Sequence, residues 1–319
     1  MEYKVRRCLE CNKEFPVPED LEECICMYCG AKFRIQPEQE ETETAPAMEE
    51  QLLSAYQQAM SGINILYEEY EKMLPQFTSQ DYSPSFQEYT RKARSVLIPA
   101  DRYALLSREA GERVVGEITE ALLAFVESKV PSNQGLFARN AGARRIDQFR
   151  FFLAVYLVPM LGHVRLGISE VLADRILNDW KKRYPGYEFK KATFEDLEEG
   201  FKRKGLCFIT SAVCETLNKP DDCYELFRFR QFRDEYLAGT EEGKGLIEHY
   251  YRIAPVIVTY INLHSDAKER YRRIWETHLL PCLKDLEDDR QEDCRKRYTE
   301  MVERLAAQLP VGSFRLESC

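Results

Sequence analysis

The sequence predicts a mainly α-helical protein with a small β-structured segment at its N-terminus. Apolar residues recur at helical spacing through most of the chain after residue 50, as in Leu53, Tyr56 and Met60. The alternating apolar and polar pattern of β-strands is confined to residues 1–35. With 18 tyrosines, 17 phenylalanines and a hydrophobic fraction of 44%, the 319 residues are sufficient for a sizeable core.

Two segments of the N-terminal region repeat each other at an offset of 18 residues. Each has a Cys-x-x-Cys turn followed by a short apolar strand, and the matching positions are Cys8 and Cys26, Cys11 and Cys29, Phe15 and Phe33, Val17 and Ile35. Asn12 and Gly30 follow the two cysteine pairs, where the chain must turn back and a positive φ is expected. The repeat predicts a zinc ribbon over residues 1–35.

The four paired cysteines have the spacing of a tetrahedral metal site. Two Cys-x-x-Cys turns place four thiolates around one zinc ion at about 2.3 Å. We therefore expect one structural zinc ion, bound by Cys8, Cys11, Cys26 and Cys29. Cys24 could compete as a ligand, but it has no partner at the repeat spacing and is expected to be a spectator. A redox Cys-x-x-Cys motif would instead begin a helix of an α/β fold and needs no second pair.

Charge and hydropathy disfavour nucleic acid and membranes as partners. The net charge is −9. Residues 1–36 contain six lysines and arginines against seven acidic residues, so this region has little electrostatic attraction for the phosphates of a nucleic acid. No stretch approaches the ~20 apolar residues of a membrane span, and no apolar signal core begins the chain. We expect a cytoplasmic protein whose cysteines outside the ribbon are reduced.

The predicted organisation has four parts. The zinc ribbon (1–35) is followed by an acidic flexible linker (36–50), which contains six glutamates and two prolines. A helical domain (51–204) comes next, with a helix to Pro75, a helical region over 84–129 broken at Pro99, a central helix near 142–160 and further helices N-capped by Ser169 and Thr193. A second helical domain (205–319) includes a helix beginning at 219–222 and one over 243–263 that Pro255 should kink.

The segment 205–261 contains three motifs in order. They are Cys207-Phe208-Ile209-Thr210-Ser211-Ala212, then Phe229-Arg230-Gln231-Phe232-Arg233-Asp234, then Gly243-Lys244-Gly245-Leu246-Ile247 with Tyr250-Tyr251-Arg252-Ile253-Ala254-Pro255. This segment resembles the bacterial CFI-box domain, which typically lies at the C-terminal end of otherwise unrelated proteins. The resemblance implies a bacterial protein and a small helical module, and it implies no activity. The chain departs from the commoner box at Val213-Cys214-Glu215, where Ala-Tyr-Gly is frequent, and it continues for almost sixty residues beyond the box.

Cys207 is the candidate reactive thiol of the helical body. If Gly205 begins a helix, Cys207 lies in its first turn near Arg203, and both the helix terminus and the cation would lower the pKa of the thiol. His249 could then act as base. The alternative, which we prefer, is burial of Cys207 within the apolar run 206–209.

Other candidate sites have weaker signals. Cys207 and Cys214 are seven residues apart, about 10.5 Å along one helix, which excludes a shared zinc ion or a disulfide. A Cys214–Cys223 pair across the intervening turn stays open. His278 and Cys282 have ligand spacing but no third ligand, and His163 and His264 are isolated. Arg230 and Arg233 lie among phenylalanines and could bind a phosphate, a carboxylate or a nucleic-acid strand, but surrounding acids such as Glu225 and Glu235 favour a role in packing. Arg230 and Asp234 form an i,i+4 pair.

The sequence thus predicts a non-catalytic protein: a structural zinc ribbon tethered to a helical interaction body that acts as adaptor or scaffold for another protein. It contains no Gly-rich phosphate loop and no convergent acid–base set. A cysteine-dependent enzyme, or a thiol-modified protein acting through Cys207, is the alternative. The identity of the partner and the oligomeric state do not follow from the sequence, nor does the reactivity of Cys207, Cys214 or Cys223.

Overall fold

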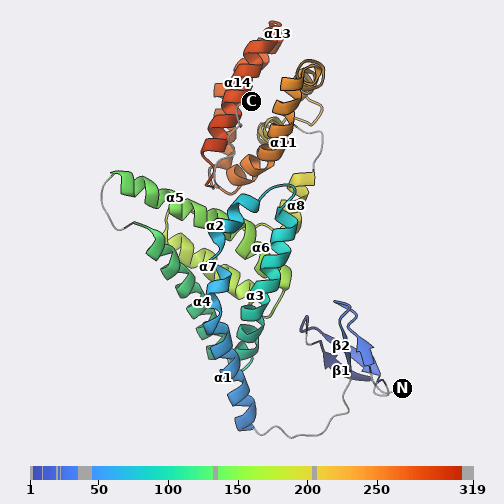
Figure 1. Cartoon of the computed structure of the whole chain (residues 1–319), viewed down its shortest axis with the longest axis vertical. Coiled ribbons are helices and arrows are strands. Elements are labelled where there is room, and N and C mark those ends of the chain that lie inside the picture. Colours follow the sequence, from blue (N-terminus) through green and yellow to red (C-terminus); the bar gives the residue numbers. More distant parts are fainter. Residues whose placement is uncertain are drawn as a thin grey trace.

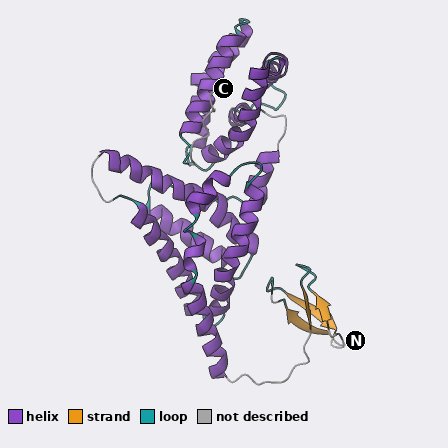
Figure 2. Cartoon of the chain, viewed as in Figure 1, coloured by secondary structure: helices purple, strands orange, loops and turns teal. Residues whose placement is uncertain are grey.

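The computed structural model describes residues 3–8, 10–18, 21, 23–34, 45–131, 136–202 and 207–310. The N-terminal region forms two antiparallel hairpins, and the rest of the described chain is helical (Figures 1 and 2). The first hairpin pairs β1 (Tyr3–Arg7) with β2 (Glu14–Pro18), and the second pairs β3 (Glu23–Ile25) with β4 (Lys32–Arg34). The predicted class, a helical body with a small N-terminal β ribbon, is confirmed.

Helix α1 begins at Ala45 and ends at Ser61, so the expectation of extended chain up to residue 50 is wrong for residues 45–50. Its sequence explains the earlier start. Pro46 falls in the first turn, where a helix does not need the missing N–H. Residues 36–44 of the expected linker lie outside the described residues.

The first helical part continues from α1 through long, packed helices. Its elements are η1 (Ile63–Leu66), α2 (Tyr70–Met73), η2 (Leu74–Gln76), α3 (Tyr82–Ala104), α4 (Arg108–Lys129), α5 (Leu136–Phe152), η3 (Leu153–Leu157), α6 (Val158–Val164), α7 (Ser169–Arg183) and α8 (Phe194–Lys202). Helices α1, α3 and α4 lie alongside one another (Figure 1). The predicted break at Pro99 is wrong, because α3 continues through this buried proline to Ala104. The break comes instead at Ser107, whose hydroxyl accepts from the N–H of Ala110 and caps α4.

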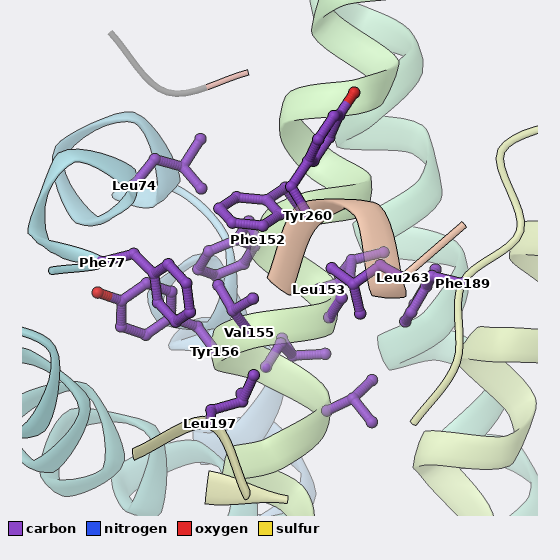
Figure 3. Packing of buried hydrophobic residues seen from close by; sticks show 14 of the residues in the cluster. Leu74, Phe77, Phe152, Leu153, Val155, Tyr156, Phe189, Leu197, Tyr260 and Leu263 are labelled. Atoms are coloured by element: carbon purple, nitrogen blue, oxygen red, sulfur yellow. The ribbon is translucent and has the colours of Figure 1, made fainter. Parts of the chain in front are cut away.

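The centre of this part is the π-helical turn η3, whose five residues are all buried. Figure 3 shows Leu153, Val155 and Tyr156 of this turn surrounded by side chains from other elements, among them Phe77 and Leu197. The Tyr82 hydroxyl donates to the Val155 carbonyl at 2.8 Å. The prediction of a central helix near 142–160 is therefore correct in its position. The helix is not regular throughout, because it includes a π-helical turn.

The second helical part has shorter elements. They are α9 (Phe208–Thr216), α10 (Tyr224–Gln231), η4 (Phe232–Tyr236), η5 (Leu237–Gly239), α11 (Glu241–Asn262), α12 (Ala267–Ile274), η6 (Trp275–Leu279), α13 (Leu280–Glu287) and α14 (Gln291–Ala307). Helix α11 contacts α9 and α14. The helix expected to begin at 219–222 starts later, at Tyr224. The backbone of Asn218 has a positive φ of 56°, so the chain turns there before α10.

Helices α5 and α11 join the two helical parts. The rings of Phe151 and Tyr260 lie 5.8 Å apart, and the Tyr260 hydroxyl donates to Asp147 at 2.6 Å. Tyr260 and Leu263 lie beside Phe152 and Leu153 in Figure 3. Buried side chains from both parts form one continuous cluster. The predicted boundary between domains, at 204/205, lies outside the described residues.

Within the described residues, no helix combines the length and the apolarity needed to span a membrane.

Candidate metal centre

The two Cys-x-x-Cys turns have the same backbone geometry. The N–H of Cys8 donates to the Lys13 carbonyl at 2.9 Å, and the N–H of Asn12 donates to the Cys8 carbonyl at 2.8 Å. In the second turn the N–H of Cys26 donates to Ala31 at 2.8 Å, and that of Gly30 donates to Cys26 at 2.9 Å. The repeat in the sequence is therefore a repeat in the structure.

Asn12 and Gly30 close these turns in the left-handed region, with φ of 58° and 74°. Only glycine, and less readily asparagine or aspartate, adopts this conformation at little cost. The expectation of a positive φ at both positions is confirmed. Each turn is thus closed by a residue that lets the chain reverse directly after its second cysteine.

The four sulfur atoms converge. Sγ of Cys8 lies 3.5 Å from Sγ of Cys29, and Sγ of Cys11 lies 3.5 Å from Sγ of Cys26. All four lie within 4.8 Å of one another. Four sulfurs at about 2.3 Å from a tetrahedral centre are about 3.8 Å apart, so the arrangement fits a metal ion with little adjustment.

The protein prepares at least one of these thiols as a thiolate. Burial raises the pKa of Cys26, but backbone N–H groups of Tyr28 and Cys29 outweigh it and lower that pKa to about 6. At Cys11, burial dominates and raises the pKa to about 12. A bound cation would remove this penalty, because it stabilises every thiolate that ligates it.

Cys24 lies in β3, outside the group of four. Burial raises the pKa of its thiol, and the neighbouring Cys26 and Cys8 raise it further. The structure therefore separates Cys24 from the four converging sulfurs, as the repeat spacing indicated.

The ribbon has a small core of its own. Phe15 and Val17 are buried together with Cys8 and Cys26, and this cluster is separate from the core of the helical body. The ribbon also exposes several large apolar side chains: Val5, Leu21, Ile25, Met27 and Tyr28 are between 45% and 68% exposed. A groove of about 630 Å³ runs between the hairpins, with Val17, Leu21 and Ile25 among its lining residues.

Two described hydrogen bonds connect the ribbon to α3. The Arg94 guanidinium donates to the Glu10 carbonyl, and the Asn12 amide donates to Oδ2 of Asp101, both at 3.2 Å. Asp101 is only 4% exposed, and its Oδ1 accepts from the N–H of Ile168 at 2.9 Å. Asn12 thus closes a metal-binding turn and contacts the body.

Cys207, the candidate nucleophile, lies at the N-cap of α9 and is buried. Residues 203–206, including the expected cation at 203, lie outside the described residues. Burial raises the pKa of Cys207, although the Arg233 and Arg230 charges partly oppose the shift. This environment is the reverse of the one that activates a catalytic thiol. His249 does line the same cavity as Cys207. The sequence suggested that these two residues could be neighbours, but it did not determine it.

The other described cysteines of the body occur in two adjoining pairs. Burial raises the pKa of Cys214, and the neighbouring Cys223 raises it further, to about 12, so these two thiols are adjacent although both are free. Sequence reasoning missed a second pair, Cys282 with Cys294, both fully buried. Both residues lie on the apolar faces of consecutive helices, which indicated that each would be buried. An apolar face does not determine which residues of two helices are in contact.

The remaining candidates have structural partners. Arg230 pairs with Asp221 at 2.9 Å, so the predicted pair with Asp234 is wrong. Arg233 takes Asp234 instead, at 2.7 Å, and donates to the Tyr251 hydroxyl at 3.0 Å. His278 lies in η6 and His163 in α6, and neither belongs to a metal-ligand group among the described residues. His264 is buried against Arg150.

Comparison with known proteins gives no match: no family model fits the chain, and no curated protein or solved structure is detectably similar to it. The converging cysteines therefore define the chain as one with a candidate four-cysteine metal site on a mainly helical protein. Function is inferred from that site and from the surfaces around it.

Proposed function

We propose that this protein is a non-catalytic adaptor whose N-terminal ribbon binds one zinc ion and presents an apolar surface to a protein partner. The observation that carries the proposal is a ribbon that uses four cysteines for one site and leaves Ile25, Met27 and Leu21 exposed. Thiolate-rich tetrahedral sites suit zinc. A shell completed by four thiolates has no open position for water, so the metal has a structural role.

The chemistry of the surface supports a protein rather than a nucleic acid as partner. Large apolar side chains that lie exposed and close together on a small domain form a patch, and such patches mark interaction sites. The apolar groove between the hairpins could take side chains of a partner. The ribbon has six basic and seven acidic residues within 1–36, so it lacks the positive field that phosphates require. We place the protein in the cytoplasm, a reducing compartment in which cysteines stay as thiols.

The segment 205–261 is proposed to be a CFI-box-like helical module within this body, and the chain is proposed to be bacterial. Its role would be structural, because the conspicuous charged residues of its motifs are engaged in ion pairs and its thiol Cys207 is buried. An enzyme acting through Cys207 is disfavoured by the raised pKa of that thiol.

The experiment compares capture of partners by three zinc-loaded forms of the full-length protein from bacterial lysate. Wild type should retain a partner, which is then purified and its binding remeasured. Ile25→Ser with Met27→Ser should lose that partner by at least tenfold in affinity while keeping its zinc. Leu105→Ser with Val171→Ser, which changes exposed apolar residues of the body instead, is the matched control. Equal binding by all three forms would contradict the proposal.

A further inference from the structure

A partly enclosed cavity lies in the second helical part, remote from the cysteine cluster. Its enclosed volume is about 70 Å³, and it lies between α11 and α14, with α10, η4 and η5 also contributing. Its walls are mainly apolar, with Phe229, Phe232, Leu246, Tyr250, Tyr298 and Val302 prominent. One water-sized group needs roughly 10–15 Å³ by the same measure, so the cavity has room for about five to seven heavy atoms.

His249 supplies the polar feature of this cavity. The residue lines it, is only 8% exposed, and its Nε2 has no hydrogen-bond partner among the described residues. Its Nδ1 lies 3.1 Å from Nη2 of Arg252. A guanidinium can only donate, so Nδ1 accepts and the neutral ring carries its proton on Nε2. A residue of the cavity wall therefore has a buried N–H donor without an acceptor.

The histidine stays neutral in this setting. Burial lowers the pKa of His249, and the neighbouring Arg252 charge lowers it further, against a smaller opposing effect of Glu303. The other cations at the cavity are already neutralised. Arg233 pairs with Asp234 at 2.7 Å, and Arg295 pairs with Glu292 at 2.6 Å and with Glu242 at 2.7 Å. Both arginines that line the cavity are thus paired with carboxylates, and exposed Glu303 would repel an anion.

We propose that this cavity binds a small, uncharged, largely apolar molecule through one hydrogen-bond-accepting oxygen placed against Nε2 of His249. An apolar body suits the aromatic and aliphatic walls, and a carbonyl oxygen would satisfy the buried donor, whose unpaired state costs free energy. The site is independent of the ribbon and of its metal. It gives the helical body a ligand-binding capacity beyond its role as a scaffold.

The test uses two probes of the same shape, cyclohexanone and methylenecyclohexane, which differ in one oxygen acceptor. Their dissociation constants for the full-length protein are measured by NMR titration. In wild type, cyclohexanone should shift the Nε2 resonance of His249, and methylenecyclohexane should not. His249→Phe should reduce the preference for cyclohexanone by about 2- to 10-fold, the range of one neutral hydrogen bond. His249→Gln, which keeps an N–H donor, should preserve that preference.

His163→Gln is the matched control, because His163 lies outside the cavity and should leave both affinities unchanged. The proposal is overturned if neither neutral probe binds up to its solubility limit, or if His249→Phe keeps the wild-type preference. If that variant does not fold, the wild-type Nε2 resonance decides alone: equal shifts with both probes, or none with cyclohexanone, overturn the proposal.

Discussion

The side-chain amide of Asn12 donates to the carboxylate of Asp101 at 3.2 Å, and so joins a metal-binding turn of the ribbon to helix α3. Asn12 lies directly after the ligand Cys11 and has a positive φ. Asp101 is buried and also accepts from Ile168. One residue therefore shapes the cysteine turn and contacts the helical body.

This contact should contribute little to the stability of the body. The ribbon has a separate apolar core, so we expect its removal to change the free energy of unfolding by about 1 kcal/mol or less, the value of one exposed and one part-buried hydrogen bond. Deleting residues 1–44 leaves α1 intact and is the test, read by helical circular dichroism on heating. Asn12→Gly, which keeps the positive φ and removes only the amide, is the matched variant. A loss above about 2 kcal/mol on truncation would mean that the ribbon is part of the core.

The ribbon should bind one zinc ion per chain and fold only with it. Its apolar core is too small to fold alone, and metal binding in comparable sites supplies about 10–16 kcal/mol. Cys11→Ser and Cys26→Ser should reduce zinc affinity at least tenfold, measured by competition with a chelator. Cys24→Ser should bind zinc as wild type does, because Cys24 lies outside the group of four. Zinc-free protein with an unchanged ribbon spectrum would contradict this prediction.

Gly243 should tolerate no side chain. A Cβ at this position would lie 2.0 Å from the Leu237 carbonyl oxygen, where α11 begins against η5. Gly243→Ala should therefore lower stability by about 2–4 kcal/mol, since backbone must move. Gly245→Ala meets nothing within 4 Å and should be neutral or raise stability by up to about 1 kcal/mol through helix propensity. Thermal unfolding of the two variants side by side checks this, and equal effects would refute the clash.

Cys207 should behave as a packing residue. Cys207→Ser places a hydroxyl in a buried site and should cost about 1–3 kcal/mol in unfolding free energy, with partner binding unchanged. Its alkylation by iodoacetamide in zinc-loaded native protein should be slower than that of half-buried Cys223, because burial raises the pKa of the Cys207 thiol. Fast, pH-sensitive labelling of Cys207 would instead support an enzyme.

Stability should fall as the pH drops below about 6.5. His264 accepts from Arg150 at Nε2 and donates from Nδ1 to the Tyr260 carbonyl, so its ring is neutral. Burial lowers its pKa, as do Arg150 and Arg270, while Tyr260 and Asp147 act in the opposite direction. Below the ordinary histidine pKa the unfolded chain therefore binds more protons than the native one, and unfolding free energy is lost at up to about 1.4 kcal/mol per pH unit for each such group.

The pKa of His249 and that of His278 are lowered in the same direction, chiefly by burial, so His264→Gln should remove part of this slope and not all of it. Denaturant titrations between pH 7 and pH 5 measure the effect. An unchanged slope in His264→Gln would contradict the prediction, because it would mean that this ring binds protons equally in the folded and unfolded chains.

The candidate metal site could be read from the sequence because its geometry is local. A Cys-x-x-Cys turn and the residue that closes it, Asn12 or Gly30, depend on a few consecutive residues. The cavity around His249 depends on how α11 and α14 meet. Helical periodicity shows which face of each helix is apolar, but it does not determine the partner helix or the height at which they contact.

Proline was the least reliable signal in the helical body. It predicted a break at Pro99, but this residue is buried and α3 continues through it, since packing outweighs a local cost of about 3 kcal/mol. The π-helical turn around Val155 had no sequence signal either. Its backbone is supported by Tyr82, more than seventy residues away along the chain, so a local pattern could not indicate it.

The shared core of the two helical parts has a consequence for synthesis on the ribosome. Phe151 and Phe152 emerge well before Tyr260 and Leu263, the residues of α11 that lie against this region of the core. At 5–20 residues per second, the chain from Lys202 to Leu263 takes roughly 3–12 s to make. During that interval, the apolar side chains of the nascent first part that Tyr260 and Leu263 later cover are exposed. We expect this intermediate to depend on chaperones to avoid aggregation.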